Sequence, residues 1–372
     1  MKHRGHVLIL GGYGTFGSRI VRALVLKGFK VTITGRNQSK AQRLSESILH
    51  DQPQIQVDIA CFDVQTQLNE YLVKLKPDLV IHTCGPFQSQ QTDIAQDILQ
   101  SGIHYIDLSD SRNYIQAMSE LNGLAKQKQL TAITGASTVP ALSSAVLQYL
   151  KNQFDIQNFK SVKIGISPGQ RTDRGLATTQ AVLSYVGKPL KPWVGAGKVR
   201  YGWFDTYLQP YPNIKNRLMS NCEAPDLDLL PMVFDIKRLT FSAGMESQLL
   251  HRMIGLLAWL VKWRLPIKLE KHADKLLKMS RWFDPLGSED GGMHVHVLGT
   301  DNQGHTINKT WYIEAFNNHG PQIPAIPAII MAEKILTTNY QRGVIPCVNQ
   351  ITLEEYLFEL KHLNMKTTIT NC

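Results

Sequence analysis

The sequence predicts an α/β fold, with an N-terminal doubly wound parallel sheet followed by a second domain of α+β type. Three observations predict it. Short β-branched runs alternate with helical patterns from residue 6 to about 135, a glycine-rich turn joins the first run to the first helix, and the alternation lapses near residue 140. Because 372 residues exceed what one hydrophobic core usually serves, we expect domains at 1–140 and 141–372.

Six strands are expected in the first domain. They are HVLIL (6–10), KVTIT (30–34), QVDIACF (56–62), DLVIH (78–82), HYIDL (104–108) and TAIT (131–134). Helical spacing occupies the segments between them, at 16–28, 38–50, 65–75, 91–102 and 114–128. Strands joined by helical crossovers form a parallel sheet with helices on both faces.

The second domain shows a different pattern of elements. Strand-like pieces lie at 159–169, 291–300 and 305–316, with one long helix among them. Pro324 and Pro327 stand where a helix would begin, and the apolar residues that follow predict a helix near 324–338 that can pack back on the first domain.

Charge and cysteine usage exclude several classes of protein. The formal net charge is +10, but the basic residues are dispersed and no run of five like charges occurs, so we expect a phosphorylated cofactor and no nucleic-acid partner. The five cysteines are far apart and never form a CxxC pair, which argues against a disulfide framework and a zinc knuckle. The short apolar run at the N-terminus leads straight into glycines rather than a cleavage site, so we expect a cytoplasmic protein.

The most hydrophobic segment is Leu249 to Leu265. It contains Arg252, Lys262 and Arg264 and is shorter than the roughly 20 apolar residues of a membrane span. A buried or interface helix is the first interpretation. Because its end is basic and carries Trp259 and Trp263, a helix lying on a membrane surface is the second.

The glycine-rich turn GGYGTFG directly follows the first strand and directly precedes the first helix. Gly12, Gly14 and Gly17 satisfy the G-x-G-x-x-G spacing, in which the first glycine allows the tight turn, the second lets the backbone approach a pyrophosphate and the third lets the helix pack on the strand. The first turn of the helix then offers unpaired N–H groups to phosphate. Its place in the first βαβ unit favours a phosphate-binding turn over a purely structural one.

The end of the second strand indicates which dinucleotide is bound. An NAD enzyme usually has a carboxylate there for the ribose 2′-hydroxyl, whereas an NADP enzyme offers a cation to the 2′-phosphate. The sequence has Gly35 and Arg36 with no carboxylate, and Asn37, Ser39 and Lys40 are further donors. NADP is therefore favoured over NAD, against the alternative that Arg36 is only a solvated surface residue.

Other cofactor contacts are expected where later strands end, because ligands of open α/β sheets lie beyond the carboxyl ends of the strands. Asp63 follows the third strand, where it can meet the adenine or simply cap a helix. Gly85, Pro86 and Phe87 follow the fourth strand in a stiff turn that can lie along the nicotinamide ribose.

No catalytic residue emerges from the sequence. Residues near the expected site of hydride transfer are Asp107, Asp110, Arg112, Ser137 and Thr138, of which Asp110 and Ser137 are equally good helix N-caps.

Candidates in the second domain are no clearer. His319, Arg171 and Arg174 could handle a proton or anchor a substrate, but each has a structural alternative. His294 and His296 share one face of a strand without a third ligand at readable spacing, so no metal site is expected. Hydride transfer needs no protein nucleophile, because the cofactor supplies the chemistry.

Several of these stretches together resemble the saccharopine dehydrogenase-like family, in particular its bacterial members of mostly unassigned substrate. They are VLILGGYGTFGSRIVRAL, TGRNQSKAQRL, VIHTCGPFQSQQTDIAQDILQSGIHYIDLSD, TGASTVPALSSAVLQYL, RGLATTQAVLSYVGKP and GPQIPAIPAII. The resemblance implies an N-terminal Rossmann domain, a second domain built on a mixed sheet that binds substrate and often dimerises, and NADP-linked oxidoreduction. It places Thr15 and Phe16 with the three glycines at the pyrophosphate, Arg36 at the 2′-phosphate, and Gly85 to Phe87 beside the nicotinamide.

The functional expectation is thus an oxidoreductase that moves a hydride between NADP(H) and an unidentified small molecule, as a homodimer. The alternative is a nucleotide-bound sensor or a peripheral membrane scaffold that turns nothing over.

Overall fold

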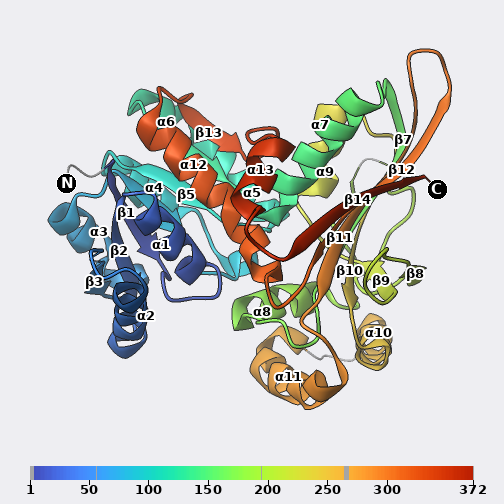
Figure 1. Ribbon diagram of the computed structural model, residues 1–372, viewed down its shortest axis with the longest axis horizontal. Helices are drawn as coiled ribbons and strands as arrows, with labels where there is room; N and C mark the ends of the chain where they lie inside the picture. Colours follow the sequence, from blue (N-terminus) through green and yellow to red (C-terminus); the bar gives the residue numbers. More distant parts are fainter. Residues whose placement is uncertain (1–3, 56, 194, 264–267, 372) are drawn as a thin grey trace. The chain divides into compact units, whose positions relative to one another are not determined.

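The computed structural model describes residues 4–371 with the exception of 56, 194 and 264–267 (Figure 1). Contacts between Cα atoms divide the chain into two compact units. Unit 1 comprises residues up to 141 together with 324–351, and unit 2 comprises 142–323 together with 352 to the C-terminus. Each unit has its own seven-stranded sheet.

The sheet of unit 1, sheet A, is entirely parallel, in the order β13-β6-β5-β4-β1-β2-β3. Its strands are β1 (His6–Leu10), β2 (Lys30–Gly35), β3 (Asp58–Cys61), β4 (Leu79–His82), β5 (His104–Asp107), β6 (Thr131–Thr134) and β13 (Gly343–Pro346). The strand order reverses direction between β1 and β4, and that reversal is the topological switch point of a doubly wound sheet.

Helices cover both faces of sheet A. They are α1 (Gly17–Leu26), α2 (Gln38–Asp51), α3 (Val64–Leu75), α4 (Asp93–Gln100), α5 (Arg112–Met118), α6 (Asn122–Gln127) and α12 (Ile326–Thr337), with 3₁₀ turns η1 (Phe87–Ser89) and η2 (Ser119–Leu121). Helices α3 to α6 bury their apolar side chains in one core cluster on the sheet, whereas α12 packs on α1, β4 and β5. The predicted doubly wound α/β fold is confirmed.

Two features of unit 1 differ from the sequence prediction. The sheet has a seventh strand, β13, which pairs with β6 although about two hundred residues separate the two in sequence. The predicted helix at 114–128 is instead α5, η2 and α6 in succession. Glycine at position 123 and the polar residues around it weaken a continuous helix there.

Sheet B of unit 2 is mixed, in the order β14-β12-β11-β7-β10-β9-β8. Its strands are β7 (Asn158–Ser167), β8 (Tyr207–Gln209), β9 (Arg217–Asn221), β10 (Leu239–Met245), β11 (Gly291–Thr300), β12 (Thr306–Ala315) and β14 (Met365–Asn371). Strands β7 and β10 pair in parallel, and the remaining neighbours are antiparallel. Unit 2 therefore has the α+β architecture on a mixed sheet that was expected.

The helices of unit 2 are α7 (Ser143–Gln153), α8 (Leu176–Tyr185), α9 (Asp226–Phe234), α10 (Gln248–Lys262), α11 (Ala273–Ser280) and α13 (Leu353–Leu360), with 3₁₀ turns η4 (Leu269–His272) and η5 (Arg281–Leu286). The hydrophobic segment Leu249 to Leu265 corresponds to α10 and Trp263, and its last two residues lie outside the described part of the chain. Among the described residues, no helix is both long and apolar enough to cross a membrane.

Candidate dinucleotide-binding site

The glycine turn between β1 and α1 is built by close backbone approach. A Cβ atom on Gly17 would lie 2.3 Å from the carbonyl oxygen of Gly11, so only glycine lets α1 start this near the turn. Gly14 is exposed, and its N–H donates to the Gly11 carbonyl at 2.8 Å. The lack of a side chain on Gly14 leaves the backbone of the turn open to a ligand.

The left-handed residue of this turn is Gly11 and not Gly12. Gly11 has φ of 75°, and a Cβ there would lie 2.9 Å from both Thr83 Oγ1 and Cys84 Sγ. Gly12 instead allows close packing, because a Cβ would lie 3.1 Å from Ile33 Cγ2 and 3.2 Å from the Ile9 carbonyl. The turn-forming role assigned to the first glycine of the motif therefore belongs to the residue before it.

Three backbone donors at the start of α1 have no acceptor within the described chain. They are the N–H groups of Thr15, Phe16 and Gly17, whereas the next, that of Ser18, donates to the Gly14 carbonyl. Unpaired donors at a helix N-terminus, together with the positive end of the helix dipole, suit a phosphate group. These are positions that the family resemblance implies for the pyrophosphate.

The residue after β4 anchors the glycine turn. Thr83 Oγ1 donates to the carbonyl oxygens of Leu10 at 2.8 Å and Gly11 at 3.2 Å, and the Thr83 N–H also donates to Leu10. The turn is thus fixed from the neighbouring strand at the switch point. Thr83 was not predicted as a site residue, although its position directly after a buried strand was the available signal.

Tyr13 positions the loop that follows β2. A Cβ on Gly35 would lie 2.4 Å from Tyr13 Cε1, so the ring lies directly against Gly35. The Tyr13 hydroxyl accepts the N–H of Asn37 at 2.9 Å, and Asn37 Oδ1 in turn accepts the N–H of Lys40 at 3.0 Å to cap α2. Arg36 stands exposed between these fixed residues. Tyr13 is one of the variable positions of the glycine motif, so its role was not predicted.

The positive charge of Arg36 affects the pKa of Cys84, which follows β4. Burial raises the pKa of the Cys84 thiol to about 12, and the Arg36 guanidinium acts in the opposite direction. Because of the raised pKa, Cys84 remains a neutral thiol at physiological pH.

Asp63 caps a helix in this structure. Its Oδ1 accepts the N–H of Gln65 at 2.9 Å at the start of α3. One carboxylate oxygen is thus used by the cap, which was the alternative left open by the sequence.

The turn after β4 is fastened by Gln90. Its Nε2 donates to the carbonyls of Cys84 at 2.6 Å and Pro86 at 3.1 Å, and the Gly85–Pro86 bond is cis. The Phe87 side chain is buried, with its ring edge-on to His82 and Tyr114 at 5.0 Å. Any contact of Phe87 with a cofactor would therefore involve its backbone.

A buried carboxylate ties together the loops after β5 and β6. Asp107 Oδ1 accepts the N–H groups of Ser109 and Gly135, both at 2.9 Å, and the Thr134 hydroxyl at 3.1 Å, while Oδ2 has no partner in the described chain. Burial raises the pKa of Asp107 to about 6, and these hydrogen bonds oppose the rise. Asp107 thus holds the loops after β5 and β6 together at the carboxyl edge of the sheet.

Asp110 does not cap a helix, although the sequence made it a good N-cap candidate. Ser111, and not Asp110, caps α5, by accepting the N–H of Tyr114. Asp110 Oδ1 accepts from Gln88 Nε2 at 2.9 Å, and burial raises its pKa. Arg112 and Thr138 are both buried, whereas Ser137 is half-buried.

In unit 2, the proton-handling candidates have local partners. Arg174 Nη2 pairs with Asp284 Oδ1 at 3.0 Å, and His319 Nδ1 accepts the N–H of Asn364 at 2.8 Å. Arg171 is exposed, and its backbone N–H donates to the carbonyl of Ser288. These contacts give Arg174 and His319 the structural roles that were weighed against a catalytic one.

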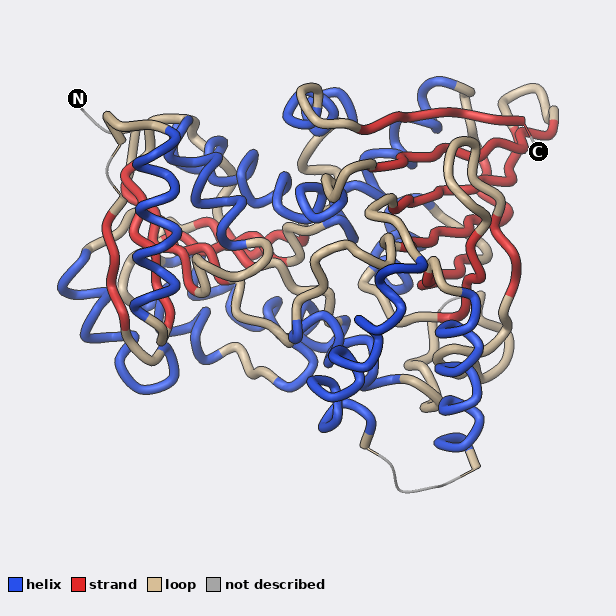
Figure 2. Tube along the Cα trace, turned by 60° about the horizontal axis from the view of Figure 1, so that its bottom comes forward, coloured by secondary structure: helices blue, strands red, loops and turns tan. Residues whose placement is uncertain are grey.

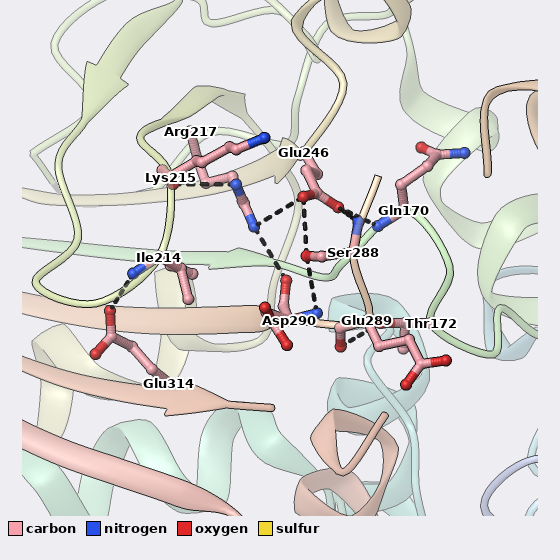
Figure 3. A network of polar contacts seen from close by, with 10 residues as sticks. All are labelled: Gln170, Thr172, Ile214, Lys215, Arg217, Glu246, Ser288, Glu289, Asp290 and Glu314. Atoms are coloured by element: carbon pink, nitrogen blue, oxygen red, sulfur yellow. Dashed lines mark hydrogen bonds and ion pairs between the residues drawn. The ribbon is translucent and has the colours of Figure 1, made fainter. Parts of the chain in front are cut away.

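A polar network closes one end of sheet B, where β7 and β10 end and β9 and β11 begin (Figure 3). Glu246 lies at its centre and accepts the N–H groups of Gln170 and Ser288, both at 2.8 Å, and the Ser288 hydroxyl at 2.9 Å. Arg217, with a side chain 1% exposed, lies 3.9 Å from Glu246 and donates to the carbonyls of Lys215 and Asp290. The network joins segments that are distant in sequence and was not foreseen.

The two histidines of β11 are packed rather than arranged as ligands. His294 is buried between Tyr211 and Tyr207, whose hydroxyls lie 3.0 Å from Nδ1 and 3.3 Å from Nε2. His296 Nδ1 lies 2.9 Å from Thr310 Oγ1. Within the part of the chain that the structure describes, no three His, Cys, Asp or Glu side chains gather in a way that could hold a metal ion.

The glycine turn with its free donors and the parallel sheet are matched by a known family. Residues 7–133 match the family model of the saccharopine dehydrogenase NADP binding domain. The resemblance drawn from the motifs is thereby confirmed for the NADP-binding domain, and the chain carries the dinucleotide-binding module of NAD(P)-dependent oxidoreductases.

Other known proteins share less with the chain. A PIGF/3-ketodihydrosphingosine reductase fusion protein of Schizosaccharomyces pombe is 34% identical over 87 residues, which are 22% of this chain and 17% of that protein. Among solved structures, an amine dehydrogenase from Mycobacterium smegmatis is 12% identical, with 92% of this chain and 94% of that chain covered, at a TM-score of 0.47. GenD2 of gentamicin A biosynthesis, in complex with NAD, is 12% identical over 100% of this chain and 98% of its own, at a TM-score of 0.42. Likenesses this distant do not identify a substrate.

Proposed function

We propose that the chain is an NADP-dependent oxidoreductase that transfers a hydride between NADP(H) and a small molecule at a C=N, C=O or C=C bond. The observation that carries the proposal is the set of free N–H donors of Thr15, Phe16 and Gly17 at the start of α1. The exposed Arg36 at the end of β2, with no carboxylate beside it, favours NADP over NAD.

Different residues of unit 1 would contact different parts of the cofactor. The turn from Gly12 to Gly17 would hold the pyrophosphate through backbone donors, and Arg36 would bind the 2′-phosphate with its planar guanidinium. Asp63 would lie toward the adenine, and the turn from Gly85 to Phe87 toward the nicotinamide ribose. The bound cofactor supplies or accepts the hydride, so the protein's task is to hold and orient it.

The first experiment is a calorimetric titration of the purified chain with NADPH and, separately, with NADH. We expect NADPH to bind at least about tenfold more tightly, a difference of roughly 1.4 kcal/mol. Arg36→Ala should lose that margin while keeping the weaker affinity for NADH, because the variant removes only the partner of the 2′-phosphate. Arg43→Ala, which removes another cation from the exposed part of α2, is the matched control and should retain the margin. Absence of binding by either dinucleotide would refute the proposal.

Turnover is tested separately from binding. Protein that binds NADPH is screened against imines, carbonyls and activated alkenes, with NADPH absorbance as the readout. Consumption of NADPH that depends on one substrate class supports an oxidoreductase. Tight binding without consumption across the three classes would instead favour a nucleotide-bound sensor or scaffold.

We propose that the protein works in the cytoplasm as a homodimer. The thiols of Cys61, Cys84, Cys222 and Cys347 are all free, which agrees with a reducing compartment. The dimer rests on the family resemblance, and light scattering on the purified chain measures it.

A further inference from the structure

One end of unit 2 exposes large apolar side chains on two consecutive helical segments. Helix α10 presents Leu249, Met253, Leu256 and Trp259, and Trp263 directly follows it, with exposed fractions from 44% to 69%. Figures 1 and 2 both place α10 and α11 at the same end of the unit. We call the exposed side chains of residues 249–263 and 268–286 the apolar end.

Helix α10 is apolar on its outer face as well as on its inner one. Its inner face buries Leu250, His251 and Ala258 and packs on β9 and β10. The exposed residues recur at spacings of three and four, from Leu249 to Trp263, so they form a separate stripe along the helix. A helix on the surface of a globular protein normally has polar residues on that face.

The second part of the apolar end lies on α11 and η5. Met279, Trp282 and Leu286 are spaced by three and four residues and are 46%, 77% and 80% exposed. Exposed tryptophan and leucine at this density are unusual for a surface that meets only water, because large apolar side chains gain free energy when they leave water. The surface therefore fits an apolar partner.

Positive charge accompanies these apolar side chains. Between residues 248 and 286 the described chain has seven Lys or Arg and three Asp or Glu. Each acidic residue already has a basic partner, in the pairs Glu270 with Lys188, Asp274 with Lys278, and Asp284 with Arg174. The unpaired basic side chains are exposed, and they are Arg252, Lys268, Lys271, Lys275 and Arg281.

We propose that the apolar end is a peripheral docking surface for an anionic lipid membrane. The Leu and Trp side chains would enter the boundary between headgroups and acyl chains, and the lysines would reach anionic headgroups with their long side chains. Tryptophan favours this depth because its ring is apolar and its N–H is polar.

The same charge argues against a second copy of the chain as the occupant. In a two-fold dimer this surface would face itself, so the unpaired Lys271, Lys275 and Arg281 of each copy would approach one another. Like charges held together at low dielectric are repulsive, whereas an anionic bilayer neutralises them.

The test is co-flotation of the full chain with lipid vesicles. Vesicles of zwitterionic lipid alone are compared with vesicles that contain about one third anionic lipid, at low and at high salt. We expect binding to the anionic vesicles, with weaker binding to the zwitterionic ones and at high salt. Equal binding to both vesicle types, or none to either, overturns the proposal.

Variants separate the apolar contribution from the charge contribution. Leu256→Glu with Trp282→Glu should reduce vesicle binding by at least about tenfold. Lys271→Gln and Lys275→Gln should each reduce binding to anionic vesicles by about fivefold, because each surface lysine is worth about 1 kcal/mol there. Phe358→Glu is the matched control, because this phenylalanine is 61% exposed on α13, outside the apolar end.

Light scattering without lipid distinguishes the competing occupant. We expect the mass of the particle to be unchanged by Leu256→Glu with Trp282→Glu. A dimer that these substitutions split into monomers would show that a second copy covers the apolar end, and the membrane proposal would be wrong. Far-ultraviolet circular dichroism of the same variants reports whether unit 2, which carries both substitutions, remains folded.

Discussion

The ends of the two sheets use their polar groups in opposite ways. At the carboxyl edge of sheet A, the backbone donors of Thr15 to Gly17 and the cation of Arg36 have no partner in the described protein. At the end of sheet B, Glu246 accepts three hydrogen bonds and Arg217 donates to two carbonyls. Polar groups that remain unpaired are available to a ligand, whereas groups that pair with one another fix the loops around them.

The unpaired groups at sheet A are therefore suited to binding a ligand, whereas the paired groups at sheet B stabilise the fold. The donors of unit 1 are exposed or lie at a helix end, where water satisfies them until a ligand does. The Glu246 side chain is 7% exposed, and its burial would raise its pKa, but the N–H groups of Gln170 and Ser288 and the charge of Arg217 keep the pKa below its ordinary value. We therefore expect substitutions in the Glu246 network to change stability, and substitutions at the edge of sheet A to change cofactor affinity.

The largest effect is expected for Glu246→Ala. The variant leaves the buried Arg217 without its carboxylate and three donors without an acceptor, so the free energy of unfolding should fall by about 3–5 kcal/mol. Urea denaturation followed by tryptophan fluorescence measures it. The half-exposed pair Glu270 with Lys188 provides the control, because Glu270→Ala should cost at most about 1 kcal/mol. Equal losses of unfolding free energy in Glu246→Ala and Glu270→Ala would show that the buried Glu246 network contributes no more to stability than a half-exposed ion pair.

Asp107 tests an intermediate case, a buried carboxylate with one satisfied and one unpaired oxygen. Since its pKa is raised from 3.8 to about 6, the folded state holds the proton at pH values where the unfolded state has lost it. The raised pKa of Asp107 therefore lowers the free energy of unfolding as pH rises from about 4 to about 6. Asp107→Asn lacks this contribution, so its stability relative to the native chain should improve by about 2–3 kcal/mol between pH 4 and pH 7.

Chemical denaturation at both pH values measures the change. Asp235→Asn serves as the control, because that carboxylate is 81% exposed beside Lys237. A constant difference between Asp107→Asn and the native chain at the two pH values would show that Asp107 does not titrate in this range.

How far the sequence predicts each region follows from the range of the interactions. In unit 1 the strands and the glycine turn are local patterns, so HVLIL and TAIT match β1 and β6 residue for residue. Strand β13 was missed because GVIP is too short to show a period, and its pairing with β6 joins distant parts of the chain. In unit 2, β9 and β10 are short and contain Ser, Gly and Asn, so alternation is weak, although β11 has the predicted bounds.

In the candidate dinucleotide-binding site, too, local patterns could be predicted from the sequence and long-range contacts could not. The glycines and Arg36 could be located by spacing alone, because the motif is contiguous with a strand and a helix. Tyr13 and the Glu246 network could not, since their roles depend on contacts with residues 24 to 76 positions away.

The smallest effect concerns how unit 1 holds Arg36 in place. Tyr13→Phe keeps the ring against Gly35 but removes the hydroxyl that accepts the Asn37 N–H. Loss of one hydrogen bond at a partly exposed position is worth about 0.5–1.5 kcal/mol, so NADPH affinity should fall about three- to tenfold. NADH affinity should change less, because NADH has no 2′-phosphate for Arg36 to meet. Calorimetric titration measures both affinities, and Tyr71→Phe, which keeps the ring stacked on Phe62, is the control. If both dinucleotides lose affinity equally, Tyr13 supports the glycine turn as a whole rather than the residue that distinguishes them.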